Sequence, residues 1–151
     1  MTGVQTCALP IWTPLPTVLG DETQLTQLLQ NLIGNAIKYR HPLRKPVITI
    51  SVLESNREWL FEFKDNGIGF SNQYNERIFG IFQRLNNDRV TGNGIGLAIC
   101  KRIIEKQGGR IWAESIENEG SIFSFSIPNK DRNSVYTEGV NLDNVFEKEM
   151  A

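Results

Sequence analysis

The chain has 151 residues and is almost neutral, because 16 basic and 17 acidic side chains give a formal net charge of -1. Hydrophobic residues make up 40% and charged residues 22%, a composition typical of a single globular domain that argues against wholesale disorder. The balanced charge excludes the basic footprint expected of a nucleic-acid-binding protein or of a protein held on an anionic membrane. The sequence lacks an apolar run of the ~20 residues that span a bilayer, and its two isolated cysteines suit a reducing, cytoplasmic compartment.

The first segment, residues 1–11 (MTGVQTCALPI), matches no pattern found further along the chain. It is similar to a translated sequencing adapter, so we predict that it is non-native and lies outside the fold, with a short native strand as the alternative. From Trp12 onward the sequence predicts ordered structure. An extended stretch over residues 14–19 is followed by a helix that begins at Asp21, where Gln24 completes a capping box.

The helix that begins at Asp21 is predicted to have two distinct faces. Apolar residues at helical spacing form a broad face that we expect to pack on a sheet: Leu25, Leu28, Leu29, Leu32, Ile33, Ala36 and Ile37. Asn31, Asn35 and Lys38 fall together in a narrow stripe opposite this face. A solvated surface would explain the stripe. However, asparagine is unfavourable inside a helix, so two asparagines one turn apart favour a use for their amide oxygens, such as binding a hard cation together with phosphate.

Two alternating segments follow, residues 46–53 and 59–64, which predict antiparallel strands joined by a polar hairpin loop. The second strand leads into residues 65–69 (Asp-Asn-Gly-Ile-Gly), which place a carboxyl group at a strand end beside two glycines. Glycine allows the backbone to approach a ligand closely, although this segment taken alone is also an ordinary turn. A short helical pattern over residues 73–82 comes next, before a polar stretch that we expect to be mobile.

Glycines open the last predicted helix. Residues 92–97 (Gly-Asn-Gly-Ile-Gly-Leu) precede an apolar helical pattern that ends at the pair Gly108 and Gly109. Unhindered amide groups at a helix N-terminus can bind a phosphate group. A Rossmann fingerprint would need an apolar strand before the glycines, and the preceding segment is polar. Residues 110–115 and 121–127 predict two further strands.

Together, residues 31–39, 65–69, 79–82 and 92–98 resemble, in order, the N, G1, F and G2 boxes of histidine kinase catalytic domains (the GHKL superfamily). The segments around residues 77–85 and 96–102 are most similar to phytochrome-type and PAS-linked sensor kinases. The resemblance covers about residues 14–128, so we assign residues 12–128 to this domain. It implies an α/β (α+β) two-layer sandwich: a mixed, mainly antiparallel sheet covered on one face by helices, with a mobile ATP lid (the Bergerat-type fold). The first strand and helix of the family would be missing, which makes the domain N-terminally truncated.

The resemblance also implies ATP and Mg²⁺ as cofactors and assigns a role to each matching residue. Asn35 would bind Mg²⁺, with Asn31 as a second ligand or water anchor. Lys38 would meet phosphate oxygens, Tyr39 would line the site, and Asp65 would accept a hydrogen bond from the adenine amino group. The other implied nucleotide-binding residues are Gly67, Gly69, Phe79, Phe82, Arg84, Gly92, Gly94, Gly96 and Leu97.

Several of these roles compete with simpler explanations. Phe79 and Phe82 would anchor one side of the lid over residues 83–91, but ordinary core packing accounts for them equally well. Arg84 or Arg89 would supply a guanidinium group to phosphate, although a solvated surface charge is the common role of arginine. The only histidine, His41, precedes a proline and lacks the surroundings of a phosphoacceptor, so we expect a surface loop residue.

The implied reaction is phosphoryl transfer from ATP to a histidine on a separate dimerisation domain, with a response regulator as an indirect partner. We expect a monomer without nucleic-acid or direct membrane contact. ATPases of the gyrase, MutL and Hsp90 type are an alternative, but they usually carry a glutamate where this chain has Asn31, and an amide cannot serve as a general base. A degenerate nucleotide-binding module is the other alternative. The polar tail, residues 129–151, is predicted to be flexible, with a short amphipathic helix near residues 141–149 as the alternative.

Overall fold

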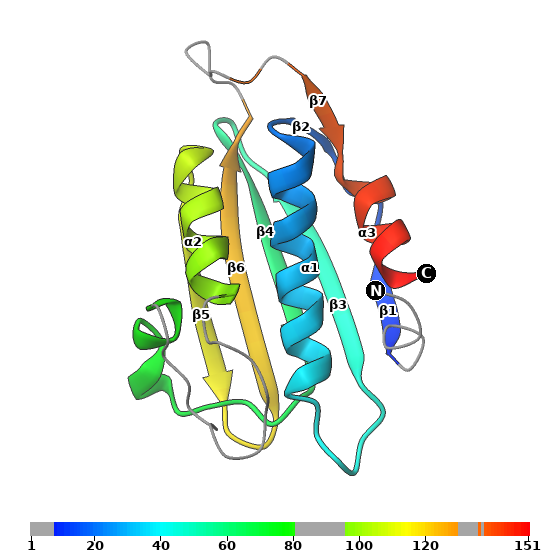
Figure 1. The fold of residues 1–151 in the computed structure, drawn as a ribbon, viewed down its shortest axis with the longest axis vertical. Helices are drawn as coiled ribbons and strands as arrows, with labels where there is room; N and C mark the ends of the chain where they lie inside the picture. Colours follow the sequence, from blue (N-terminus) through cyan, green and yellow to red (C-terminus); the bar gives the residue numbers. More distant parts are fainter. Residues whose placement is uncertain (1–7, 81–95, 130–135, 137) are drawn as a thin grey trace.

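The computed structural model describes residues 8–80, 96–129, 136 and 138–151. Its main sheet has the strand order β1-β3-β4-β6-β5 (Figure 1). The strands of this sheet are β1 (Leu9–Trp12), β3 (Val47–Glu54), β4 (Glu58–Asp65), β5 (Ile111–Ile116) and β6 (Gly120–Pro128). β1 pairs with β3 in parallel, and the other neighbours pair antiparallel, which confirms the mixed, mainly antiparallel sheet. A second, two-stranded sheet joins β2 (Thr17–Leu19) to β7 (Gly139–Asn141).

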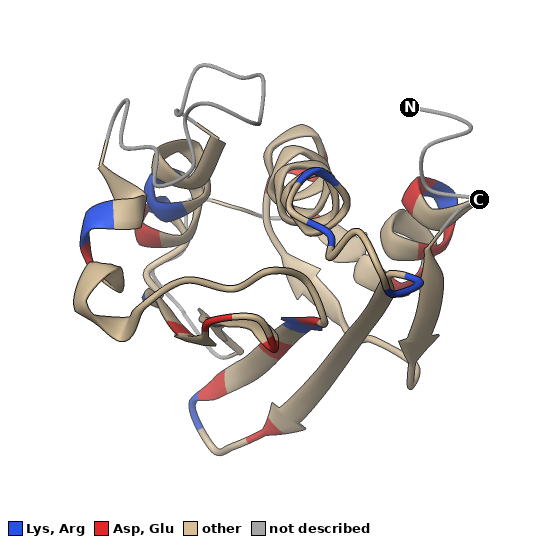
Figure 2. Cartoon of the chain, turned by 90° about the horizontal axis from the view of Figure 1, so that it is seen from below, with Lys and Arg blue, Asp and Glu red and all other residues tan. Residues whose placement is uncertain are grey.

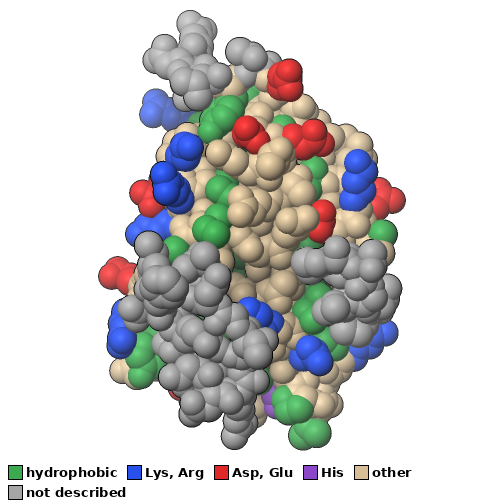
Figure 3. Space-filling view, in the orientation of Figure 1, with side chains coloured by type: hydrophobic (Ala, Val, Ile, Leu, Met, Phe, Trp, Pro, Cys, Tyr) green, Lys and Arg blue, Asp and Glu red, His purple; other side chains and the backbone are tan. Residues whose placement is uncertain are grey.

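Helices cover one face of the main sheet and complete the predicted two-layer sandwich. Figure 2 looks along the layers and shows α1 (Glu22–Lys38) and α2 (Gly96–Lys106) on the same side of the sheet. α3 (Leu142–Met150) lies beside α1. The helical pattern predicted over residues 73–82 is instead two short 3₁₀ turns in its described part, η2 (Asn72–Tyr74) and η3 (Arg77–Phe79). On the face shown in Figure 3, acidic and basic side chains are interspersed among the described residues, as the composition predicts.

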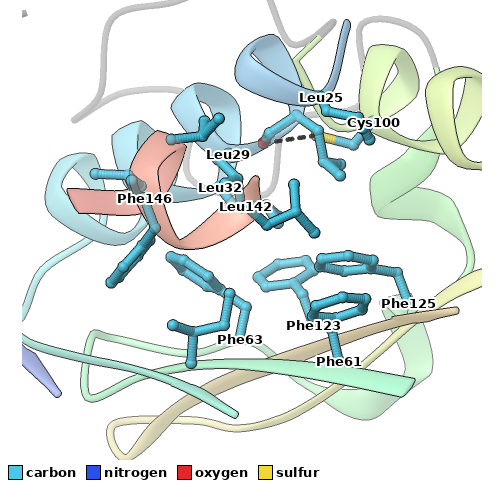
Figure 4. Close-up of a cluster of buried hydrophobic side chains, with 14 of the residues drawn as sticks. Leu25, Leu29, Leu32, Phe61, Phe63, Cys100, Phe123, Phe125, Leu142 and Phe146 are labelled. Atoms are coloured by element: carbon cyan, nitrogen blue, oxygen red, sulfur yellow. Dashed lines mark hydrogen bonds between the residues drawn. The ribbon is translucent and has the colours of Figure 1, made fainter. Parts of the chain in front are cut away.

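The core lies between α1 and the phenylalanines of β4 and β6 (Figure 4). Every apolar residue predicted for the inner face of α1 is buried, and Asp21 caps this helix by accepting a hydrogen bond from the Gln24 amide at 3.0 Å. Phe61 and Phe125 stack with their ring centroids 4.8 Å apart. Burial of one such side chain stabilises the fold by about 1.5–3 kcal/mol, so this layer holds α1 firmly on the sheet.

The prediction that residues 1–11 lie outside the fold is wrong for residues 8–11. Leu9 pairs with Val47 in the parallel register of β1 and β3, and the Leu9 amide donates to the Pro46 carbonyl at 2.8 Å. The edge of β3 would otherwise expose unpaired amide and carbonyl groups, and β1 satisfies them. Residues 1–7 lie outside the described residues, and a non-native origin of the segment stays a prediction.

The prediction of a flexible tail is wrong for residues 138–151, and the alternative, an amphipathic helix docked on the domain, is correct. Asp143, in the first turn of α3, accepts hydrogen bonds from Trp12 Nε1 and from the Leu15 amide, each at 3.0 Å. Trp12 also packs edge-on against Phe146 with ring centroids 5.1 Å apart. Within the described ranges, none of the helices combines the length and apolarity needed to cross a membrane.

Candidate nucleotide site

The C-terminus of α1 and the C-terminus of β4 lie together at the lower end of the molecule in Figure 1, and the N-terminus of α2 lies higher, beside the middle of α1. Hydrogen bonds and close contacts join them. The Ile68 amide, just after β4, donates to the carbonyl of Tyr39 at the end of α1, at 2.9 Å. A methyl group placed on Gly96, the first residue of α2, would lie 3.6 Å from Asn31 Oδ1 on α1. The fold therefore joins the helix of the predicted N box to the G1 loop and, at Gly96, to the described part of the G2 box.

Asp65 ends β4 with its carboxyl group largely buried. Burial raises the pKa of this carboxyl group to about 6, although backbone hydrogen bonds from Gly67 and Ser121 act in the opposite direction. The Gly67 amide donates to Asp65 Oδ1 at 2.8 Å and so orients the side chain. A buried, oriented carboxyl group is a selective acceptor for an amino group, because few other partners reach it.

Gly67 and Gly69 are required by the loop itself. A methyl group on Gly67 would lie 2.5 Å from the Tyr39 carbonyl oxygen. Gly69 has a φ of 64°, in the left-handed region, and a methyl group there would lie 2.2 Å from the Ile116 carbonyl oxygen. The close approach that the sequence predicts is therefore made, in this structure, to α1 and β5. Contact with a nucleotide stays a prediction for both glycines.

The polar stripe of α1 runs from Asn31, which lies against the start of α2, to Lys38 at the exposed end of the helix. Asn31 and Asn35 are half-buried, whereas Lys38 is exposed in the last turn. The Asn31 amide nitrogen is buried, and the Asn31 side chain lies beside the buried Cys100 thiol of α2, whose pKa it acts to lower against the larger, raising effect of burial.

These residues fit a cation bound together with phosphate. The amide oxygens of Asn31 and Asn35 are ligands of the kind that Mg²⁺ accepts alongside phosphate and water. Lys38 supplies an exposed ammonium group nearby on the same helix. α2 begins at Gly96 beside Asn31, so the positive end of its dipole lies next to the amide side chain of this stripe.

The remaining predicted residues divide into two groups. Phe79 is buried and packs edge-on against Phe123 with ring centroids 6.3 Å apart, and Leu97 packs partly buried against the core. Core packing therefore accounts for their position in the structure. Four candidates, together with the predicted lid, lie outside the described residues: Phe82, Arg84, Gly92 and Gly94.

Sequence reasoning missed the residues that support the loop after β4. Ser115 on β5 is buried, and its hydroxyl accepts from the Phe70 amide and donates to the Gly120 carbonyl, each at 2.8 Å. Arg44 and Asn118 also bond to this loop. Nothing in their local pattern distinguishes them, since their partners in this loop are distant in sequence. The one sequence signal was an asparagine in the turn between the last two strands, because asparagine tolerates the left-handed region, and Asn118 has a φ of 66°.

Comparison with known proteins gives the family. A family model described as "Histidine kinase-, DNA gyrase B-, and HSP90-like ATPase" matches residues 20–131. The chain belongs to this family. The match covers all four boxes and confirms the resemblance of this chain to histidine kinase catalytic domains.

Curated relatives of this ATPase-family chain include phytochromes and sensory kinases. Cyanobacterial phytochrome A of Nostoc sp. (strain PCC 7120) is 55% identical over 116 residues, which cover 76% of this chain and 15% of the relative. The phytochrome-like protein Cph1 of Synechocystis sp. (strain PCC 6803) is 50% identical, with coverages of 76% and 15%. The adaptive-response sensory kinase SasA of Synechococcus sp. (strain CC9902) is 40% identical, with coverages of 76% and 30%. The chain thus spans a minor part of each relative's length.

Solved structures agree on the fold. The mycobacterial sensor histidine kinase MprB superposes with a TM-score of 0.72 at 23% identity, covering 83% of this chain and 85% of that one. The catalytic domain of histidine kinase ThkA gives 0.67 at 28% identity, with coverages of 85% and 83%. Full-length ShkA in complex with AMPPNP gives 0.69 at 28% identity, covering 84% of this chain and 27% of that one. These likenesses confirm the two-layer architecture.

Proposed function

We propose that this chain binds Mg-ATP and presents the γ-phosphoryl group to a histidine on a separate dimerisation domain, as the catalytic domain of a sensor histidine kinase. Two contacts support this proposal: the loop after Asp65 bonds to the end of α1, the helix that carries Asn31 and Asn35, and α2 begins beside Asn31. An acceptor for a base, amide ligands for a cation and a helix N-terminus for phosphate are the groups that a nucleotide requires.

Asp65 would recognise the adenine base. Its carboxylate accepts a hydrogen bond from the adenine amino group, whereas guanine presents a carbonyl oxygen at the equivalent position and would be repelled. The Gly67 amide keeps Asp65 Oδ1 in place at 2.8 Å before the nucleotide arrives. Selection of ATP over GTP therefore follows from a preorganised acceptor.

Asn31, Asn35 and Lys38 would serve the phosphate end of the nucleotide. The two amide oxygens would hold Mg²⁺, and the ammonium group of Lys38 would balance phosphate charge. Bound Mg²⁺ supplies charge neutralisation to the phosphoryl group during transfer. An amide at position 31 cannot deprotonate water, which favours transfer over the ATP hydrolysis of gyrase-type relatives.

His41 is not the phosphoacceptor in this proposal. Its Nε2 lies 2.8 Å from Asn118 Oδ1, and its Nδ1 accepts from the Leu43 amide at 3.1 Å, so both ring nitrogens already have partners. The attacking imidazole would come from the dimerisation domain, and a response regulator would receive the phosphoryl group afterwards. We place this exchange in the cytoplasm, with this chain as a monomer.

Isothermal titration calorimetry with ATP, ADP and GTP in Mg²⁺ tests the proposal. We expect micromolar-range ATP binding, with affinity lowered at least about tenfold in Asp65→Asn because the adenine acceptor is weakened. Asn35→Ala should lower the affinity for ATP in Mg²⁺ much more than in EDTA, because EDTA removes the cation that Asn35 would bind. Asn56→Ala, in the exposed β3–β4 loop, is the matched control. A folded wild-type chain that binds no ATP would overturn the proposal and favour a degenerate module.

A further inference from the structure

Arg44, in the connection between α1 and β3, donates hydrogen bonds to three backbone carbonyls. Its Nε bonds to Asn66 O at 3.2 Å, and its Nη2 bonds to Gly67 O at 3.2 Å and to Asn118 O at 2.6 Å. The first two carbonyls belong to the loop after β4, and the third belongs to the β5–β6 turn. One guanidinium group therefore ties together two segments that are far apart in sequence.

Other bonds fix the same loop from both sides. The Asn66 side chain accepts from the Val47 amide at 2.8 Å and donates to the Lys45 carbonyl at 3.0 Å. From the β5–β6 turn, the Asn118 amide donates to the Ile68 carbonyl at 2.6 Å. Arg44 is the residue whose side chain joins both sets of contacts.

A solvated surface charge is the usual role of an exposed arginine. Arg44 differs because its donors are directed at carbonyl oxygens, and in the described part of the chain it has no carboxylate within salt-bridge distance. The planar fork of arginine suits such multiple bonding, and lysine, a single point charge, cannot reproduce it.

The contact is linked directly to the Asp65 carboxyl group. Arg44 holds the carbonyl of Gly67, and the amide of the same residue donates to Asp65 Oδ1 at 2.8 Å. A shift of the Gly67 backbone would therefore move the hydrogen-bond donor that orients Asp65. The loop carries no large side chain at Gly67 that would hold it by packing.

We propose that Arg44 is a positioning residue that sets nucleotide affinity by holding the 66–68 backbone, and through it Asp65, in the binding-competent geometry. The proposal deepens the ATP-binding function above and rests on it. Arg44 itself touches neither base nor phosphate in this account. Its removal should weaken the binding of ATP and ADP alike, because the effect arises at the adenine end.

The test compares Arg44→Lys with Arg40→Lys. Both changes keep the positive charge in the same connection, but Arg40 Nη1 bonds only locally, to the Ile37 carbonyl at 2.8 Å. We expect ATP and ADP dissociation constants to rise about threefold to tenfold in Arg44→Lys and to stay unchanged in Arg40→Lys. Thermal unfolding of both variants checks that each is folded under the conditions of titration.

Amide hydrogen exchange without nucleotide gives an independent readout. The amides of Gly67, Ile68 and Asn118 should exchange faster in Arg44→Lys than in the wild type, while the amides of central β4 stay protected. The positioning role is overturned if these three amides exchange at the same rate in Arg44→Lys and in the wild type. It is also overturned if the wild type binds nucleotide and Arg44→Lys binds it with the same affinity. If exchange is faster in Arg44→Lys but the wild type itself binds no ATP, the proposed function is overturned and Arg44 is a purely structural residue.

Discussion

Asp65 has a pKa that burial raises from 3.8 to about 6, so its protonation differs between the folded and unfolded chain. The raised folded value means that the contribution of this carboxyl group to stability is fully present below about pH 4. That contribution is lost as the pH rises through about 6. Burial of this carboxyl group therefore destabilises the fold at neutral pH relative to acid pH.

Comparison with Asp65→Asn isolates this contribution. Asparagine keeps an acceptor for the Gly67 amide but does not ionise. Between pH 4 and pH 7 the wild type should lose up to about 3 kcal/mol of unfolding free energy relative to the variant, which is the pKa difference converted at 1.36 kcal/mol per unit. Urea unfolding at both pH values measures it. Equal pH dependence of the two proteins would contradict a buried, ionising Asp65.

Gly69→Ala tests the backbone of the same loop. The residue has a φ of 64° and lies against the Ile116 carbonyl, so a methyl group is both strained and obstructed. We expect a loss of about 1–3 kcal/mol. Gly34→Ala is the matched control, because no atom lies within 4 Å of the added methyl in α1 and the change should stabilise the helix by about 0.5–1 kcal/mol. A neutral Gly69→Ala in chemical denaturation would show that the loop is not constrained as described.

At the scale of elements, α3 shows how a polar segment becomes ordered. Its apolar residues Leu142 and Phe146 are buried against the domain, and Leu142 lines the core beside Leu25 and Leu29 (Figure 4). Asp143 provides the polar part of the docking surface. The helix therefore covers part of α1, the element that carries Asn31 and Asn35.

Asp143→Ala should undock or loosen α3. It leaves two donors, Trp12 Nε1 and the Leu15 amide, without their acceptor, which costs about 1–3 kcal/mol. Glu147→Ala, on the exposed side of the same helix, controls for the loss of one negative charge. Thermal unfolding together with Trp12 fluorescence reports both stability and docking. If the two variants were equally stable, the hydrogen bonds of Asp143 would not hold the helix.

At the scale of the whole molecule, the proposed nucleotide site draws on three elements: α1, the loop after β4 and the start of α2. None of them carries a complete site, and the proposed reaction needs a further domain for its acceptor. We therefore expect this chain to bind ATP without phosphorylating itself.

Incubation with radiolabelled Mg-ATP tests this expectation. The chain alone should acquire no acid-labile label, whereas a supplied phosphoacceptor domain from a similar kinase should be labelled. His41→Gln should support the same transfer, because the ring of His41 serves Asn118 and Leu43. Label on the chain itself that disappears in His41→Gln would show that this assignment is wrong.

The sequence by itself determined α1, the four long strands and the presence of α2, because apolar periodicity, strand alternation and caps are local signals. It also predicted the family, through four motifs in a fixed order, which the family match over residues 20–131 confirms. Only the tertiary structure decided that residues 8–12 form a parallel edge strand, that the tail docks through Asp143, that Asn31 faces α2 and that Arg44 supports the loop of Asp65. Each of these features is a set of hydrogen bonds or contacts between residues that are distant in sequence: along the edge of β3, at the Asp143 carboxyl group, or at the carbonyls that Arg44 binds. Such partners produce no periodic pattern in the local sequence.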